Sequence, residues 1–412
     1  MINDRRSERY AKLIIEQGIN IKQGQMLVIR IGVEHTAFAR LLKKTAYECG
    51  SGRVVIEYDD DASLNLDYRY APEKELSTVR ESEKQKLREE QAAGAALLHI
   101  ISYDPDVMKG VDEGKAGRIR QARGLALHDL VQYQMKSEGA WCVAALPNPR
   151  WAKKVFPKLK EEEAMTALTD AIFHTVGLDQ KGDAVKNWKK HGDVLREHCR
   201  ILNEYAFDAL HFYNGIGTDL MVPLVKNHIW GGGSEFASVT KQWFDPNIPT
   251  EEVFTAPHRM KTEGRVVASR PLNLSGTLVD GFSFDFHKGK VVSFRAKKGK
   301  TALETLLASD KGAVRLGEVA LVPYDSRISD LHILFYDTLF DENAACHLAL
   351  GASYPTTVKG GDALSEKELR ALGMNVSSVH EDFMFGTEDL SADGISADGS
   401  VVPVFRKGRL VF

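Results

Sequence analysis

The stretch MLVIRI, residues 26–31, decides the fold of the N-terminal half, together with RVVIEY at residues 53–58. Both runs are short, apolar and rich in β-branched side chains, which is typical of buried strands. Between them, apolar residues recur at helical spacing over residues 37–42. A strand, a helix and a second strand at this spacing form a βαβ unit, so the sequence predicts a parallel sheet.

The same alternation extends outward from this unit. Residues 5–17 place apolar side chains on one helical face, and residues 72–91 are so strongly charged that they predict a solvated helix. AGAALLHIIS at residues 93–102 and WCVAAL at residues 141–146 predict further buried strands. An amphipathic pattern over Ala184–Tyr205 predicts a long helix at the end of this α/β domain.

The pattern changes after about Leu210, where Gly, Pro and Asn become frequent and the apolar runs shorten. Such a pattern is typical of an α+β domain with many turns. The strands expected there include residues 264–269, 276–286 and 290–297, with a hairpin over 401–412. The predicted fold is therefore α/β plus α+β, with an N-terminal parallel-sheet domain over 1–205 and a turn-rich second domain over 206–412.

The bulk composition restricts the class of protein. A chain of 412 residues is expected to form two domains, and a net charge of −3 gives no electrostatic reason to expect nucleic acid or a membrane as a partner. The first residues are charged from the third onward, unlike a signal peptide, and no apolar stretch is long enough to span a bilayer. The cysteines are scattered, as reduced thiols in a cytoplasmic protein would be. They are Cys49, Cys142, Cys199 and Cys346.

Four segments of the second half combine acids or histidines with turn residues. They are NIPTEEVFT (247–255), GEVALVP (317–323), FDENAACHLALG (340–351) and HED (380–382). Carboxylate oxygen and imidazole nitrogen are the ligands of catalytic divalent cations. In an extended HED segment, His380 and Asp382 point to the same side and could reach one cation, although HxD also occurs in ordinary surface strands. Each segment alone is thus also compatible with an ordinary structural role that involves no cation.

The carboxylate of Glu318 stands at the edge of an apolar run, where a buried charge needs a partner. A cation is one such partner, and Arg315 or Arg327 is another. Of the adjacent pair Glu251 and Glu252, an extended chain can turn only one side chain into a site, and the local pattern does not decide which.

Glu342 and His347 would lie about 140° apart on a continuous helix, too far around it to share an ion. If Asn343 instead caps a helix, both could face one cavity, and the alternative is an exposed acid and a core histidine. Tyr354 follows seven residues after His347. Its phenol could stabilise an oxyanion beside a cation, although an isolated tyrosine is more often a packing residue.

Taken together and in order, NIPTEEVFTAPH, LGEVALVP, LFDENAACHLALG, SYP and HEDFMFGT resemble the successive motifs of the thermophilic aminopeptidase family, which includes aminopeptidases T and S. GIGTDLMVPL (215–224) and the following HIWGGG add to this resemblance, which covers the whole second half. The residues at the family's ligand positions are Glu252, Glu318, His347, His380 and Asp382. Tyr354 matches the active-site tyrosine, Glu342 stands at a further acid expected in the metal site, and Asp337 replaces an expected asparagine.

The resemblance implies a metallo-aminopeptidase whose second domain binds two divalent cations, with zinc, cobalt, manganese and magnesium all compatible with the ligands. Glu318 would bridge the cations, Tyr354 would stabilise the oxyanion, and Glu318 or Glu342 would carry the proton to the leaving amine. The expected substrates are peptides with a free N-terminus, and the family implies a homodimer. Three alternatives stay open: another metal-dependent amide hydrolase such as a deacylase, a non-catalytic metal-binding protein, and a nucleotide-binding enzyme, which lacks support because no GxGxxG or Walker-type loop follows residues 26–31.

Overall fold

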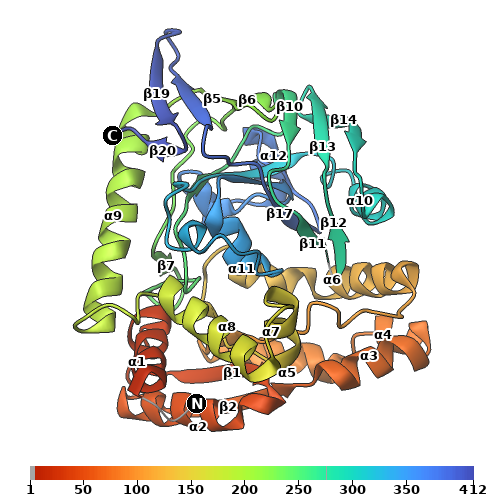
Figure 1. The fold of residues 1–412 in the computed structure, drawn as a ribbon, viewed down its shortest axis with the longest axis vertical. Coiled ribbons are helices and arrows are strands. Elements are labelled where there is room, and N and C mark those ends of the chain that lie inside the picture. The colour runs from red at the N-terminus through yellow and green to blue at the C-terminus, as the bar shows by residue number, and fades with distance from the viewer. Residues whose placement is uncertain (1–4, 275) are drawn as a thin grey trace. The chain divides into compact units, whose positions relative to one another are not determined.

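The computed structural model describes residues 5–274 and 276–412. The chain separates into two units, of which the first comprises Met1–Val194 and Gly233–Thr250 and the second comprises Leu195–Gly232 and Glu251–Phe412. The first unit contains a parallel sheet and the second contains antiparallel sheets, so the predicted mixed fold class is confirmed (Figure 1). The first unit is discontinuous, a feature that the single sequence-based boundary at residue 205 did not include.

The sheet of the first unit has four parallel strands in the order β2-β1-β3-β4. They are β1 (Met26–Gly32), β2 (Arg53–Asp59), β3 (Ala96–Ile101) and β4 (Trp141–Ala145). Helix α2 (Thr36–Glu48) connects β1 to β2, and Met26 pairs with Arg53 at the start of the register. The βαβ unit expected from MLVIRI and RVVIEY is thus confirmed.

Helices precede, connect and follow these strands. The bounds are α1 (Arg5–Leu13), a π-helical turn at Ile14–Ile19, α3 (Asp61–Tyr70), α4 (Glu73–Ser77), α5 (Glu81–Ala92), α6 (Glu113–Met135), α7 (Pro149–Val155) and α8 (Glu161–Thr175). The charged stretch 72–91, predicted as one solvated helix, forms two helices, α4 and α5, separated by extended residues at Thr78 and Arg80. Neither helix buries any residue, so its predicted solvation is confirmed. The predicted helix Ala184–Tyr205 is α9, and the two units divide within it.

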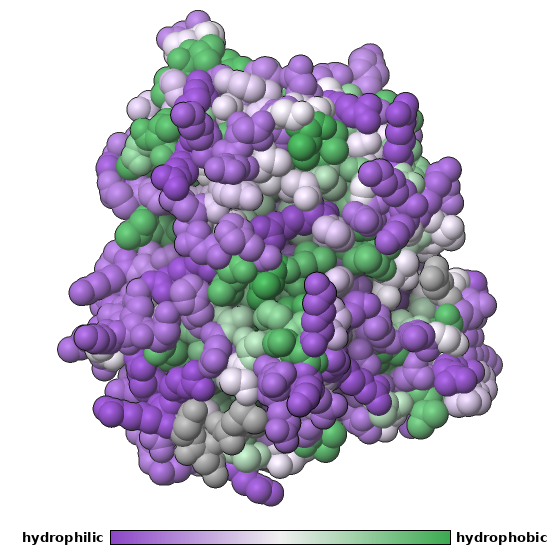
Figure 2. Space-filling view, in the orientation of Figure 1, coloured by the Kyte–Doolittle hydropathy of each residue, from purple (hydrophilic) through white to green (hydrophobic). Residues whose placement is uncertain are grey.

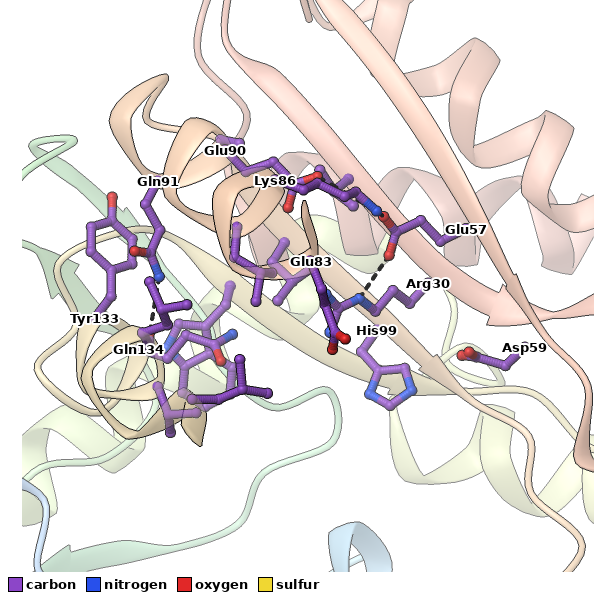
Figure 3. A pocket seen from close by; sticks show the side chains of 18 of the residues that line it. Arg30, Glu57, Asp59, Glu83, Lys86, Glu90, Gln91, His99, Tyr133 and Gln134 are labelled. Carbon is purple, nitrogen blue, oxygen red and sulfur yellow. Dashed lines mark hydrogen bonds and ion pairs between the residues drawn. The ribbon is translucent and has the colours of Figure 1, made fainter. Parts of the chain in front are cut away.

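A pocket of about 910 Å³ lies in the first unit between the sheet and helices α3, α5 and α6 (Figure 3). Arg30 on β1 and Lys86 on α5 both donate to Glu57 on β2, with Arg30 Nε 3.0 Å from the carboxylate. Arg123 on α6 pairs in the same way with Glu83. The Lys and Arg side chains that line the pocket are therefore neutralised by acids of its own wall.

The second unit is built from two main antiparallel sheets. The larger sheet has the order β14-β13-β10-β6-β5-β18-β19-β20. Its strands are β5 (Ala209–Tyr213), β6 (Asp219–Pro223), β10 (Glu263–Val267), β13 (Ser283–His287), β14 (Lys290–Arg295), β18 (Ser391–Ile395), β19 (Val401–Arg406) and β20 (Arg409–Leu410). The expected strand 276–286 is interrupted, because its first part is β12 (Thr277–Val279), which pairs with β11 (Leu272–Leu274).

The smaller sheet has the order β17-β16-β15-β9. Its strands are β9 (Val253–Thr255), β15 (Leu316–Leu321), β16 (His347–Gly351) and β17 (His380–Met384). Both β15 and β16 are buried along their whole length. Phe383 of β17 packs against the rings of Phe282 and Phe284, which joins this sheet to the hydrophobic core of the unit.

The remaining elements are short: β7 (Glu235–Ala237), β8 (Gln242–Phe244), α10 (Lys300–Leu307), α11 (Thr338–Asp341) and α12 (Glu366–Leu372). Hydrophilic residues cover most of the face shown in Figure 2. Among residues 5–274 and 276–412, no helix combines the length and the apolar character that a membrane crossing requires.

Candidate metal centre

The register of the smaller sheet brings the candidate ligands to one face. Glu318 of β15 and Asp382 of β17 both pair with Ala349 of the central strand β16, so the three residues form one row across the sheet. Paired residues in neighbouring strands point to the same face, and so do residues two apart in one strand. His347 and His380 therefore lie on the same face as Glu318 and Asp382. The small side chain of Ala349 leaves the space between the two acids open.

The alternation of side chains along an extended chain also shows which residue of the pair Glu251 and Glu252 lies on this face. Phe254 pairs with Ala320, which lies two residues from Glu318. Glu252 lies two residues before Phe254, so an extended chain places its side chain on the face of the acids. Its carboxylate lies 3.0 Å from Nε2 of His347. The structure thus brings Glu252, and not Glu251, into the cluster.

Each histidine of the cluster is oriented by the main chain. Nδ1 of His347 lies 2.9 Å from the carbonyl oxygen of Glu342, and Nδ1 of His380 lies 2.7 Å from that of Ala352. A carbonyl oxygen only accepts, so both rings donate from Nδ1 and turn Nε2 toward the carboxylates. An imidazole held in this way is the usual arrangement of a metal-binding histidine.

The carboxylate of Glu318 faces both imidazoles. Its Oε1 lies 3.5 Å from Nε2 of His347, and its Oε2 lies 3.6 Å from Nε2 of His380. Nε2 of His380 also lies 3.4 Å from Asp382. One oxygen toward each imidazole is the geometry in which a single carboxylate can contact two cations.

Glu342 reaches the cluster from a turn and not from a helix start. Residues Glu342–Ala344 form a single 3-10 turn, and His347 begins strand β16. The hypothesis that Asn343 caps a helix containing His347 is therefore wrong. Pairing of His347–Gly351 with strands on both sides overrides the local helical tendency. The turn still brings the Glu342 carboxylate into the cluster, where it lies in one group with His347 and Asp382.

Three overlapping groups of side chains could each hold a cation. They are Glu252 with Glu318 and His347, Glu318 with His380 and Asp382, and Glu342 with His347 and Asp382. Within each group the ligand atoms lie within 4.8 Å of one another. All six side chains at the sequence-derived ligand positions thus occur in at least one group.

The electrostatics of the cluster favour a bound cation. Burial raises the pKa of Glu318 to about 7 and that of Glu342 well above its ordinary value, and the neighbouring acids add to both shifts. Burial lowers the pKa of His380, but the carboxylates of Asp382 and Glu318 outweigh it and raise the pKa to about 10. Asp382 Oδ1 is buried and accepts no hydrogen bond from any described residue. Buried acids, a carboxylate oxygen without a hydrogen-bond donor, and imidazoles oriented by the main chain together fit a divalent cation.

These shifts predict the stability of the cation-free protein. Glu318 has a folded pKa raised from 4.5 to about 7, so its stabilising contribution is complete below pH 4.5 and is lost as the pH rises through about 7. The raised pKa of His380 has the same sign, and its contribution is lost as the pH rises from 6.5 to about 10. We expect the Tm of the cation-free protein to fall from about pH 5 to about pH 9. Differential scanning calorimetry after chelation measures this.

The matched control is Glu318→Gln, because other groups of the chain also titrate in this range. Glutamine cannot ionise, so the Tm of the variant should fall less steeply than that of the wild type between about pH 5 and about pH 7. If the Tm of the two proteins fell equally over this pH range, the assignment of the raised pKa to Glu318 would be contradicted. A saturating cation should oppose the trend, since protons compete with it for the same ligands.

Tyr354 lies beside the cluster. Its ring centroid is 4.9 Å from that of His380 and 5.8 Å from that of Phe254.

Asp337 belongs to none of the three groups. It accepts a hydrogen bond from the Leu339 amide at the start of α11, and burial raises its pKa to about 6. The departure from the expected asparagine therefore falls at a helix N-cap.

Comparisons with known proteins agree with this geometry. The family model described as thermophilic metalloprotease (M29) matches residues 3–410. Aminopeptidase T of Thermus aquaticus is 42% identical over 98% of this chain and 98% of its own, and aminopeptidase 2 of Geobacillus stearothermophilus is 41% identical over 98% and 97%.

A solved structure, wild-type AmpT from Thermus thermophilus, superposes with a TM-score of 0.90 at 39% identity, covering 99% of both chains. A match over nearly the whole chain extends the resemblance seen in the second half to the first. The chain therefore belongs to the thermophilic metalloprotease (M29) family, and it is a metal-dependent hydrolase of peptide bonds.

Proposed function

We propose that this protein is an aminopeptidase that holds two divalent cations side by side on the smaller sheet of its second unit. The observation that carries the proposal is the sharing of Glu318 by two groups, one with Glu252 and His347 and the other with His380 and Asp382. Each group supplies an imidazole and a carboxylate of its own, as a pair of neighbouring cation positions requires.

The charge of the cluster supports two cations over one. Four carboxylates, those of Glu252, Glu318, Glu342 and Asp382, carry four negative charges when ionised, which two divalent cations balance. A single cation would leave two buried negative charges uncompensated. When bound, the cations supply Lewis acidity, which lowers the pKa of water and polarises the scissile carbonyl.

Proton transfer belongs to the acids of the cluster. In the cation-free protein burial raises the pKa of Glu318 to about 7, so its surroundings favour the protonated form and make it a candidate proton carrier. Burial and the neighbouring acids also raise the pKa of Glu342 well above its ordinary value, which makes it the second candidate. Bound cations lower both values, so the residue that retains the higher pKa beside them is the better proton carrier to the leaving amine.

The carboxylate oxygens also suit a substrate with a free N-terminus, because its amino group can donate hydrogen bonds to them. The test is a matched pair of dipeptide amides, one with a free amine and one N-acetylated. The aminopeptidase predicts hydrolysis of the free amine alone. Hydrolysis of the acetylated substrate at a comparable rate identifies a deacylase-like enzyme instead, and a protein that binds cations but cleaves neither is the non-catalytic alternative.

Tyr354→Phe tests the proposed oxyanion donor. Its ring is fixed against His380 and Phe254, so phenylalanine should keep the packing and lose only the hydroxyl. Loss of one oxyanion donor typically reduces kcat by roughly 100- to 1000-fold with the fold intact. Steady-state kinetics at saturating metal measures this effect. An unchanged kcat assigns Tyr354 to packing.

The homodimer and the cytoplasmic location implied by the resemblance stay predictions. Light scattering on the purified chain and cell fractionation test them. The identity of the native cation is likewise open to direct measurement by elemental analysis of the protein as isolated.

A further inference from the structure

The side chain of Asn343 lies at the junction of two ligand-bearing segments. It is fully buried within the turn Glu342–Ala344. Its Oδ1 accepts a hydrogen bond from the Glu251 amide at 2.7 Å, in the segment that carries Glu252. Its Nδ2 donates to the Leu339 carbonyl at 2.9 Å and to Oε1 of Glu342 at 3.4 Å. One carboxamide therefore connects Glu342 to the chain beside Glu252.

The orientation of this carboxamide is determined by its partners. A backbone amide can only donate, whereas a carbonyl and a carboxylate can only accept. Exchanging the oxygen and nitrogen of Asn343 would place like groups against each other at all three contacts. An aspartate or a leucine of similar size could not satisfy the same three partners.

The turn itself is anchored independently of this side chain. Oγ of Ser326 donates to the Asn343 carbonyl at 3.1 Å, and the Glu342 carbonyl orients His347. The main chain thus positions the imidazole, whereas the Asn343 side chain positions the carboxylate of Glu342 and the backbone before Glu252. A change of this side chain should act on the two acids more than on the histidine.

We propose that Asn343 is a positioning residue that holds Glu252 and Glu342 at their cation-binding distance before any cation arrives. This inference rests on the proposed function and assigns to Asn343 no contact with the cation. Its basis is that a side chain without fixed partners samples several rotamers, and this freedom is lost when a cation binds. Ligands fixed in advance bind a cation more tightly, and outer-shell partners typically contribute about 10- to 100-fold in metal affinity.

The experiment measures Zn²⁺ affinity of the full chain by competition with a chromophoric chelator. Asn343→Ala is expected to weaken affinity by about 10- to 100-fold. Asn148→Ala is the matched control, because Asn148 is also a buried asparagine, its Oδ1 accepts from the Trp151 amide at 2.8 Å, and it belongs to the first unit and to none of the cation-binding groups. The Tm of the control should fall about as much as that of Asn343→Ala, whereas its Zn²⁺ affinity should stay within about twofold of the wild type. Equal affinities for Asn343→Ala and the control overturn the inference.

A double-mutant cycle separates positioning from a general loss of stability. In a Glu342→Gln background the carboxylate that Asn343 holds is gone, so the effect of Asn343→Ala on Zn²⁺ affinity should shrink by about threefold or more. If Asn343→Ala weakens Zn²⁺ affinity equally in the wild-type and Glu342→Gln backgrounds, Asn343 does not act through Glu342. Asn343→Ser is measured in parallel and carries the same comparison if the alanine variant does not fold. A wild-type chain that binds none of Zn²⁺, Co²⁺, Mn²⁺ and Mg²⁺ refutes the proposed function itself, whereas wild-type binding without an effect of Asn343 refutes only this inference.

Discussion

Glu318→Gln is expected to reduce kcat by roughly 10³-fold or more, since a positioned proton carrier alone is worth about 10²–10⁴-fold. The variant also loses the carboxylate that faces both imidazoles and is shared by two of the cation-binding groups. Steady-state kinetics on an unblocked dipeptide, with the bound cations counted in the same preparation, measures both losses. A near-normal kcat removes Glu318 from its proposed role.

The fold of this variant should survive. Burial raises the pKa of Glu318 to about 7, which means that its charged form is disfavoured in the cation-free protein. Replacing it with a neutral group of the same shape should leave the cation-free Tm unchanged or raise it above neutral pH. Glu251→Gln is the matched control, because Glu251 is a buried acid outside all three groups. It should retain activity, so that a loss confined to Glu318→Gln reports on the cluster.

Removal of the cations is expected to abolish hydrolysis. Without them, four buried acids remain close together in overlapping groups, and the raised pKa values of Glu318 and Glu342 show that their charged forms are disfavoured there. Chelation followed by dialysis should bring the activity to background, and adding back a divalent cation should restore it. Titration of the stripped protein should reach full activity at two cations per chain.

The control for this experiment is chelator already saturated with the same cation, which should leave the enzyme active. Circular dichroism of the stripped protein shows whether lost activity reflects the centre or the fold. Sustained hydrolysis by protein with far less than one cation per chain rejects the metal-dependent mechanism.

The sequence was most informative where local pattern alone determines structure. The runs at 26–31 and 53–58 predicted strands because both are short and rich in β-branched residues, and the helical pattern between them indicated that the strands are parallel. The helix over Ala184–Tyr205 was likewise visible in its amphipathic repeat. The return of Gly233–Thr250 to the first unit had no such signal, because it depends on hydrogen bonds between residues about one hundred positions apart, such as Val143 with Pro246.

The candidate ligands could be named from the family resemblance, but their arrangement could not be derived from local pattern. The choice between Glu251 and Glu252 follows from the pairing of Phe254 with Ala320, a long-range contact. The segment containing His347 was considered helical if Asn343 caps a helix, but pairing with β15 and β17 makes His347 the first residue of a strand. Asn343 was considered only as a cap, since nothing local indicates that its partner is the Glu251 amide.

The chain crosses from one unit to the other three times, after Val194, Gly232 and Thr250. A gene fragment beginning at Leu195 would therefore carry residues 233–250 away from strand β4, whose Val143 exchanges backbone hydrogen bonds with Pro246 and Ile248. Phe244 and Ile248, both buried in the intact chain, would then face water. The C-terminal half that bears the acids is therefore not expected to fold as an independent fragment. Chimeras between relatives must exchange residues 233–250 together with the N-terminal segment of the first unit.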